Sequence, residues 1–192
     1  MSELPLIAVT DSASCPRPLA EQIERLTKLT ELRPQAVILR AKSLDKAAYR
    51  TLALHAQQSC EAAGIPLILH SDWQLARELG ISMLHLPLAL LRQISEYERA
   101  YFTWLSTSVH SVGEAQEAQA LGATVLIAGH IYTTQCKAGL APRGLGFLQA
   151  VCSAVSLPVY AIGGIGFDAA QHAELQANGA RGACVMSAYM RL

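Results

Sequence analysis

The sequence predicts an α/β fold, a (β/α)8 TIM barrel, on two observations. Short apolar runs rich in β-branched residues recur about every 20 to 25 positions, and longer segments with helical periodicity separate them. The runs are apolar nearly throughout, not at every second residue, as is typical of parallel strands covered on both faces. Eight such units close most naturally into a barrel, although a doubly wound open sheet is the alternative that shares this alternation.

Each predicted strand is one of the apolar runs. In chain order the runs occupy residues 6–11, 36–41, 66–70, 83–87, 101–107, 124–129, 159–165 and 182–188.

The segments between the runs carry helix formers at 3.6-residue spacing. The clearest are residues 44–64 and 113–122, which close on Gly64 and Gly122, residues able to adopt the left-handed C-cap conformation. The sequence ends only a few residues after the eighth run, so the last helix is expected to be short or missing.

The composition suits a well-buried globular protein. The chain has 192 residues, 52% of them hydrophobic and 16% charged, and we expect a single domain over residues 1–192. Fifteen basic and fifteen acidic residues give a formal net charge of zero without a block of Lys and Arg. We therefore expect no nucleic-acid partner and no binding to an anionic membrane surface.

The apolar runs and the cysteines bear on where the protein works. No run approaches the roughly 20 residues needed to span a bilayer, and the start of the chain does not resemble a signal peptide, so a cytoplasmic location is expected. The five cysteines are odd in number and scattered, which favours reduced thiols over disulfides or a zinc site.

In a barrel of this kind the reactive face lies at the carboxyl ends of the strands, where the following loops converge. Four of the six histidines are expected at or just beyond these ends. They are His70, His85, His110 and His130.

Three cations and a pair of glycines are candidates for binding an anionic ligand. Arg40 and Lys42 leave the second strand with one residue between them, so both can serve one anionic group, or they form a solvated pair. Lys137 adds a cation on the loop after the sixth strand.

Gly163 and Gly164 follow the seventh strand, where backbone N–H groups can approach a phosphate; the alternative is a simple tight turn. Ser187 lies after the eighth strand and would complete this phosphate site.

His110 is the candidate general acid and base, because imidazole titrates near neutral pH. A purely structural histidine is the alternative. His130 has the same alternative, since it can simply hydrogen-bond its own loop.

Together these residues resemble the thiamine-phosphate synthase superfamily, TIM barrels of thiamine biosynthesis, over nearly the whole chain. The resemblance rests on VTD (9–11), LRAK (39–42), LHSDWQLA (69–76), LHLP (84–87), SVHS (108–111), GHIYTTQCKAGLAPRG (129–144), AIGGI (161–165) and VMSA (185–188).

Departures from the synthase pattern favour one branch. The synthase couples a pyrimidine pyrophosphate to a thiazole phosphate and holds Mg²⁺ on carboxylates in NDR and GQxD patterns. Here residues 70–72 read HSD and residues 87–90 read PLAL, so both carboxylates are displaced or missing. Without Mg²⁺, charge developing on the departing pyrophosphate has no neutralising ion.

The LP at 86–87, SVHS and the stretch GHxxxTxCKxGLxxRG instead resemble the TenI-like thiazole tautomerases. That resemblance implies an isomerase that brings a phosphorylated thiazole carboxylate to its aromatic tautomer without a cofactor or metal. His110 would move the proton, Gly163, Gly164 and Ser187 would hold the phosphate, and Arg40 and Lys42 would serve the carboxylate. His130, Lys137 and Gly144 belong to the same loop and are expected to line the site.

Two alternatives stay open: the Mg²⁺-dependent synthase, and a catalytically silent relative that binds the ligand and acts through a partner. A homodimer is plausible for either branch.

Overall fold

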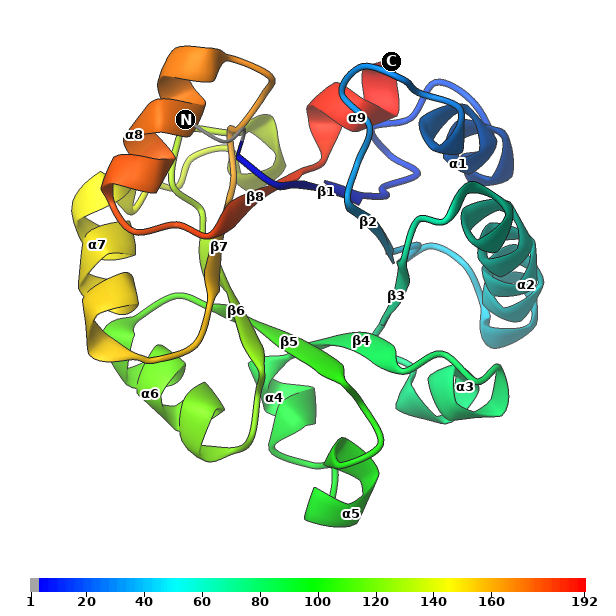
Figure 1. Cartoon of the computed structure of the whole chain (residues 1–192), viewed down its shortest axis with the longest axis horizontal. Coiled ribbons are helices and arrows are strands. Elements are labelled where there is room, and N and C mark those ends of the chain that lie inside the picture. The colour runs from blue at the N-terminus through cyan, green and yellow to red at the C-terminus, as the bar shows by residue number, and fades with distance from the viewer. Residues whose placement is uncertain (1–3) are drawn as a thin grey trace.

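The computed structural model describes residues 4–192, which form a closed barrel of eight parallel strands (Figure 1). Each strand pairs with the next, and β8 closes the ring by pairing with β1. The TIM-barrel prediction is therefore confirmed and the open sheet is excluded. Residues 1–3, with which the predicted domain begins, lie outside the described residues. The strands are β1 (Leu6–Val9), β2 (Ala36–Leu39), β3 (Leu67–His70), β4 (Met83–Pro87), β5 (Trp104–Val109), β6 (Val125–Gly129), β7 (Val159–Ile162) and β8 (Gly182–Val185).

The helices surround the strand ring on its outside (Figure 1). Two short helices follow β4, so strand and helix do not alternate as strictly as the sequence suggests. The helices are α1 (Leu19–Thr27), α2 (Lys46–Ala63), α3 (Trp73–Glu78), α4 (Leu88–Leu91), α5 (Glu96–Arg99), α6 (Val112–Ala120), the 3-10 helix η1 (Gln135–Lys137), α7 (Gly144–Ala154), α8 (Ala169–Ala177) and α9 (Ser187–Arg191). As predicted, the last helix is short.

Local sequence sets the ends of the longest helix, α2. The side chain of Asp45 accepts a hydrogen bond of 2.8 Å from the N–H of Ala48, which caps the first turn. Gly64 ends the helix with φ 65°, as its C-cap position predicts. Gly122, after α6, likewise has a positive φ of 84°.

Several strands differ in length from the predicted runs. β5 begins at Trp104, because Phe102 and the residues before it form a turn in which the N–H of Phe102 bonds to the carbonyl of Arg99. β7 ends at Ile162, so Gly163 and Gly164 belong to the following loop. These shifts place the candidate polar residues in loops or at strand ends.

The barrel interior is divided into an apolar and a polar part. The apolar part is a cluster of buried residues from six strands: Ile7, Val9, Ala36, Ile38, Ile68, Val125, Ile127, Tyr160 and Cys184. On the β4–β5 side, the buried interior residues are instead His85 and Ser106. His85 lies in the middle of β4 and is only 5% exposed, so the expectation that it stands at a strand end was wrong.

The last helix is held by α1. The side-chain amide of Gln22 donates to the carbonyl of Tyr189 at 2.6 Å, and Arg25 donates to the carbonyl of Leu192 at 3.1 Å. Figure 1 shows α9 lying beside α1. None of the helices in the described part of the chain is long and apolar enough to cross a membrane.

Candidate active site

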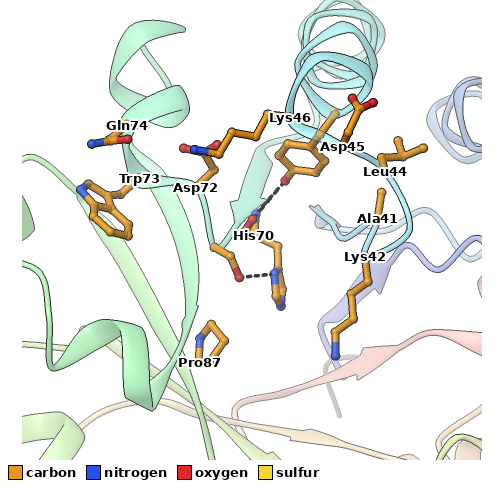
Figure 2. A pocket seen from close by; sticks show the side chains of 12 residues that line it. Ala41, Lys42, Leu44, Asp45, Lys46, His70, Asp72, Trp73, Gln74 and Pro87 are labelled. Carbon is orange, nitrogen blue, oxygen red and sulfur yellow. Dashed lines mark hydrogen bonds between the residues drawn. The ribbon is translucent and has the colours of Figure 1, made fainter.

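A cavity of about 460 Å³ lies at the carboxyl ends of β2, β3 and β4, the face on which TIM barrels carry their sites. The loop after β2 and the start of α2 form one wall, the turn from β3 into α3 forms another, and the end of β4 completes it (Figure 2). Its lining residues are Ala41, Lys42, Leu44, Asp45, Lys46, Tyr49, His70, Ser71, Asp72, Trp73, Gln74 and Pro87.

His70 is the histidine that lines this cavity. It is the last residue of β3, and its Nδ1 lies 2.7 Å from the hydroxyl of Ser71. The hydroxyl of Tyr49 fixes the backbone below it, accepting from the N–H of His70 at 3.2 Å and donating to the carbonyl of Leu39 at 2.8 Å. Burial, together with the charges of Arg40 and Lys42, lowers the pKa of His70 to about 4. The imidazole is thus neutral at pH 7.

Of the two predicted cations after β2, Lys42 reaches the cavity wall and Arg40 does not line it. The guanidinium of Arg40 forms an ion pair with Asp11, at the end of β1. The hydroxyl of Thr10 accepts from the N–H of Arg40 and donates to its carbonyl, both at 2.8 Å. Lys42 and Lys46 are therefore the cations that line the cavity, while the charge of Arg40 is partly balanced by Asp11.

The loop after β6 is closed at its base and reaches across to β8. The N–H groups of Arg143 and Gly144 donate to the carbonyls of His130 and Ile131, at 2.9 and 3.1 Å. His130 Nε2 lies 3.4 Å from the carbonyl of Leu140 within the same loop, as its structural alternative predicts.

Lys137 is exposed in η1, near the tip of the same loop. The adjacent Cys136 Sγ lies 4.0 Å from the hydroxyl of Ser187, which begins α9. The loop thus brings Lys137 and Ser187 to one side of the rim.

Gly163 and Gly164 are required by close packing. Both have positive φ, 105° and 69°. A Cβ on Gly163 would lie 2.3 Å from the Cβ of His130, and one on Gly164 would lie 2.5 Å from the carbonyl oxygen of Thr133. The approach of the β6 loop therefore accounts for both glycines, and their predicted phosphate-binding role stays a prediction.

His110 lies outside the cavity lining. Its side chain is 45% exposed, with Nδ1 3.2 Å from a carboxylate oxygen of Glu114 on α6. The same oxygen accepts from the backbone N–H of His110 at 2.6 Å. Because the carboxylate occupies the Nδ1 side, Nε2 is the nitrogen left to exchange a proton with a ligand.

A second hollow, of about 470 Å³, adjoins the cavity between α3 and α5. Trp73 and Gln74 line both. The indole N–H of Trp73 donates to Glu98 at 2.9 Å, which holds the ring as the wall between them.

The structure also brings together side chains that the sequence reading did not connect. His85 Nδ1 and Nε2 lie 3.0 Å from the hydroxyls of Ser106 and Ser108, respectively. Trp104, Ser106 and Ser108 stand at every second position of the run WLSTSV. Because side chains alternate between the two faces of a strand, all three lie on the same face of β5. This two-residue spacing in the sequence could have predicted that the two serines face the barrel interior.

The donor atoms at this rim do not fit Mg²⁺, which prefers carboxylate oxygens in an octahedron. The carboxylate of Asp72 accepts from the N–H of Leu75 at 2.9 Å and so caps α3, while Asp11 is paired with Arg40. Across residues 4–192, no group of three or more His, Cys, Asp or Glu side chains is placed to hold a metal ion.

The fold and its rim define a (β/α)8 barrel with a lysine-containing, largely neutral cavity at the carboxyl ends of its strands. Comparison with known proteins narrows this class. The family model described as thiamine monophosphate synthase, TMP-TENI, matches residues 6–189, and the chain belongs to this family. The superfamily resemblance drawn from the sequence motifs is confirmed.

Named relatives support the same assignment. A thiamine-phosphate synthase of Listeria monocytogenes serotype 4b is 37% identical over 157 residues, which cover 79% of this chain and 72% of that protein. One from Herpetosiphon aurantiacus is 39% identical over 157 residues, covering 79% and 73%. These names favour the synthase alternative over the tautomerase that the motifs suggested.

Among solved structures, the thiamine phosphate pyrophosphorylase from Pyrococcus furiosus superposes with a TM-score of 0.78 at 24% identity. The match covers 97% of this chain and 87% of that one. At this identity the likeness shows the shared barrel.

Proposed function

We propose that the protein is an enzyme of thiamine biosynthesis that binds a phosphorylated thiazole and catalyses a metal-independent proton transfer, as a thiazole tautomerase does. This proposal rests on the residues at the ends of β3 and β4 and on whether their atoms could bind a metal ion. His70 and Pro87 stand in the regions where the synthase pattern has its metal-binding carboxylates, and Asp72 is used as a helix cap.

The reaction needs one group that removes a proton from the ring carbon and returns it to the exocyclic carbon. His110 can do this through Nε2, while Glu114 holds its Nδ1. The gain of ring aromaticity makes the step favourable.

The two charged groups of such a substrate would bind at different parts of the rim. Gly163, Gly164 and Ser187 would hold the phosphate beside Lys137 and the loop from His130 to Gly144. Lys42 would meet the carboxylate, and an entering anion would compete with Asp11 for Arg40.

The second candidate is thiamine-phosphate synthase, and the names of the relatives favour it. This reaction joins a pyrimidine to the thiazole nitrogen as pyrophosphate departs. Mg²⁺ would neutralise the leaving group. Asp45 and Asp72 are the carboxylates that line the cavity, and each caps a helix. Asp72, which follows β3, is the one that could contribute to holding the ion. Coupling would require Asp72 to leave its capping position.

One experiment decides between them. The purified protein is incubated with the thiazole phosphate carboxylate tautomer, and aromatisation is followed by proton NMR in deuterated buffer. Acceleration that persists with EDTA supports the tautomerase. Thiamine phosphate formed from both synthase substrates only when Mg²⁺ is present would replace it with the synthase, and binding without either turnover would indicate the silent relative.

A further inference from the structure

The loop after β7 is held by side chains of α8, the next helix on the outside of the barrel (Figure 1). The side-chain amide of Gln171 bonds this loop twice: its Oε1 accepts from the N–H of Gly166 at 2.9 Å, and its Nε2 donates to the carbonyl of Gly164 at 3.0 Å. An amide can do both because it carries an acceptor and a donor. Nε2 of His172 lies 2.8 Å from the carbonyl of Gly166. Helix α8 thus fixes the loop at three backbone atoms.

The carbonyl of Gly163 is bonded as well, by the β6 loop, since it accepts from the N–H of Tyr132 at 3.0 Å. By contrast, the N–H groups of Gly164 and Ile165 donate to no acceptor within residues 4–192, the part of the chain that the structure describes. Unbonded N–H groups of consecutive residues are the groups with which a loop binds an anion. The carbonyls of this loop are therefore used by the protein, and two of its N–H groups are left for a ligand.

The bonded carbonyls determine where these two N–H groups point. Both peptide bonds concerned are trans, so the C=O of one residue and the N–H of the next lie in one plane and point in opposite directions. The carbonyl of Gly164 is turned toward Gln171, and the N–H of Ile165 therefore points away from Gln171. In the same way, the bond from Tyr132 to the carbonyl of Gly163 directs the N–H of Gly164. Each N–H group depends on a different residue for its direction.

We propose that Gln171 is a positioning residue for anion binding: by holding the carbonyl of Gly164, it directs the N–H of Ile165 toward a phosphate group bound at this loop. Gln171 itself does not contact the anion. The inference rests on the place that the proposed function gives to the substrate phosphate, but it does not depend on which reaction the enzyme catalyses.

Inorganic phosphate is the probe that tests this role. In the ¹⁵N-labelled full chain at pH 7, adding phosphate should move the amide proton signals of both Gly164 and Ile165 downfield, as a new hydrogen bond to an anion does. In Gln171→Met, which keeps the length of the side chain but lacks the amide, only Gly164 should still respond. The dissociation constant for phosphate should rise about threefold to tenfold, as expected for the loss of one hydrogen bond.

Two further variants complete the test. Glutamate can accept from the N–H of Gly166 but cannot donate to the carbonyl of Gly164, so Gln171→Glu should bind phosphate no better than Gln171→Met. The matched control is Gln119 on α6, which also bonds a loop: its side chain accepts from the N–H of Ser156 at 2.8 Å, just before β7 and so at the amino ends of the strands. Gln119→Met should bind phosphate as the wild type does, although it too loses a bond between a glutamine and the backbone.

The possible failures of this proposal and of the proposed function can be told apart. If phosphate moves both amide signals equally in Gln171→Met and in the wild type, the loop binds phosphate but Gln171 only anchors α8, and the proposal is overturned. If phosphate moves neither signal in the wild type, the phosphate site at this loop is wrong as well. The expected shifts in a protein without tautomerase activity would support the role of Gln171 and reject the proposed reaction.

Discussion

His70 and His85 stand opposite each other on β3 and β4, with ring centroids 5.2 Å apart and their planes inclined at 39°. The surroundings of each ring disfavour its charged form. His85 is buried and His70 is half-buried, and the charge of Arg40 adds to the effect on each. His70 therefore adds no positive charge to the cavity that Lys42 and Lys46 line. An anionic ligand in the cavity would meet the ammonium groups of these two lysines beside one uncharged imidazole.

The stability of the protein should fall as the pH is lowered from about 6.5 toward 4. Both histidines have lowered pKa values in the folded state, about 4 for His70 and about 3 for His85. In this window the unfolded chain binds protons that the folded chain does not, so the unfolding free energy rises with pH. Each histidine contributes up to about 1.4 kcal/mol per pH unit. Urea denaturation at pH 7.0, 6.0 and 5.0 measures the slope, and His70→Asn should reduce it. Equal slopes for the variant and the wild type would show that His70 does not resist protonation.

Replacing His110 should remove proton transfer but leave binding intact. His110→Ala is expected to slow the isomerisation by roughly 10² to 10⁴, the usual contribution of a positioned acid–base group. Glu114→Gln should cause a smaller loss, because the amide can still contact Nδ1. Turnover is measured by NMR and product affinity by calorimetry. A fully active His110→Ala protein would mean that another rim group, such as His70 or His130, transfers the proton.

Lys42→Ala should weaken the binding of a phosphorylated thiazole carboxylate by roughly 10- to 100-fold, as expected for the loss of one charge-assisted hydrogen bond. The matched control is Lys28→Ala, at the C-cap of α1, where the side chain is 77% exposed. Calorimetry at two salt concentrations measures both effects. If the two variants bound the ligand equally well, Lys42 would not be the residue that binds its anionic group.

Two glycine substitutions should have opposite effects on stability. Gly163→Ala places a methyl group 2.3 Å from the Cβ of His130 at φ 105°, and should lower the unfolding free energy by about 2 to 4 kcal/mol. Gly146→Ala, in α7, meets no atom within 4 Å and should raise the unfolding free energy by about 0.5 to 1 kcal/mol. Chemical denaturation of both variants tests the pair. An unchanged Gly163→Ala protein would show that the β6 loop can move away.

The barrel could be predicted because its strands are continuous apolar runs and its longest helix carries clear caps. Asp45 and Gly64 mark the ends of α2 as their residue types suggest. The short helices α4 and α5 were missed, because four-residue helices carry too little periodicity to be recognised. Their placement depends on packing against neighbouring elements.

The candidate site was predicted less completely than the fold. Strand ends can be found in a sequence, so the positions of Lys42, His70 and His110 near the rim could be anticipated. Partners from distant segments could not, such as Asp11 for Arg40 or the β6 loop for Gly163. The bonding of the interior serines Ser106 and Ser108 to His85 could not be anticipated either, because serine in an apolar run carries no sign of which neighbour it will bond.

The indole of Trp73 is an intrinsic fluorescent probe of the cavity. The sequence has two tryptophans, and Trp104 packs against Tyr160 in the barrel interior, away from the cavity. In a Trp104→Phe protein, tryptophan emission would come from Trp73 at the cavity wall alone. Ligand entry could then be followed in real time by stopped-flow emission, without attaching a label.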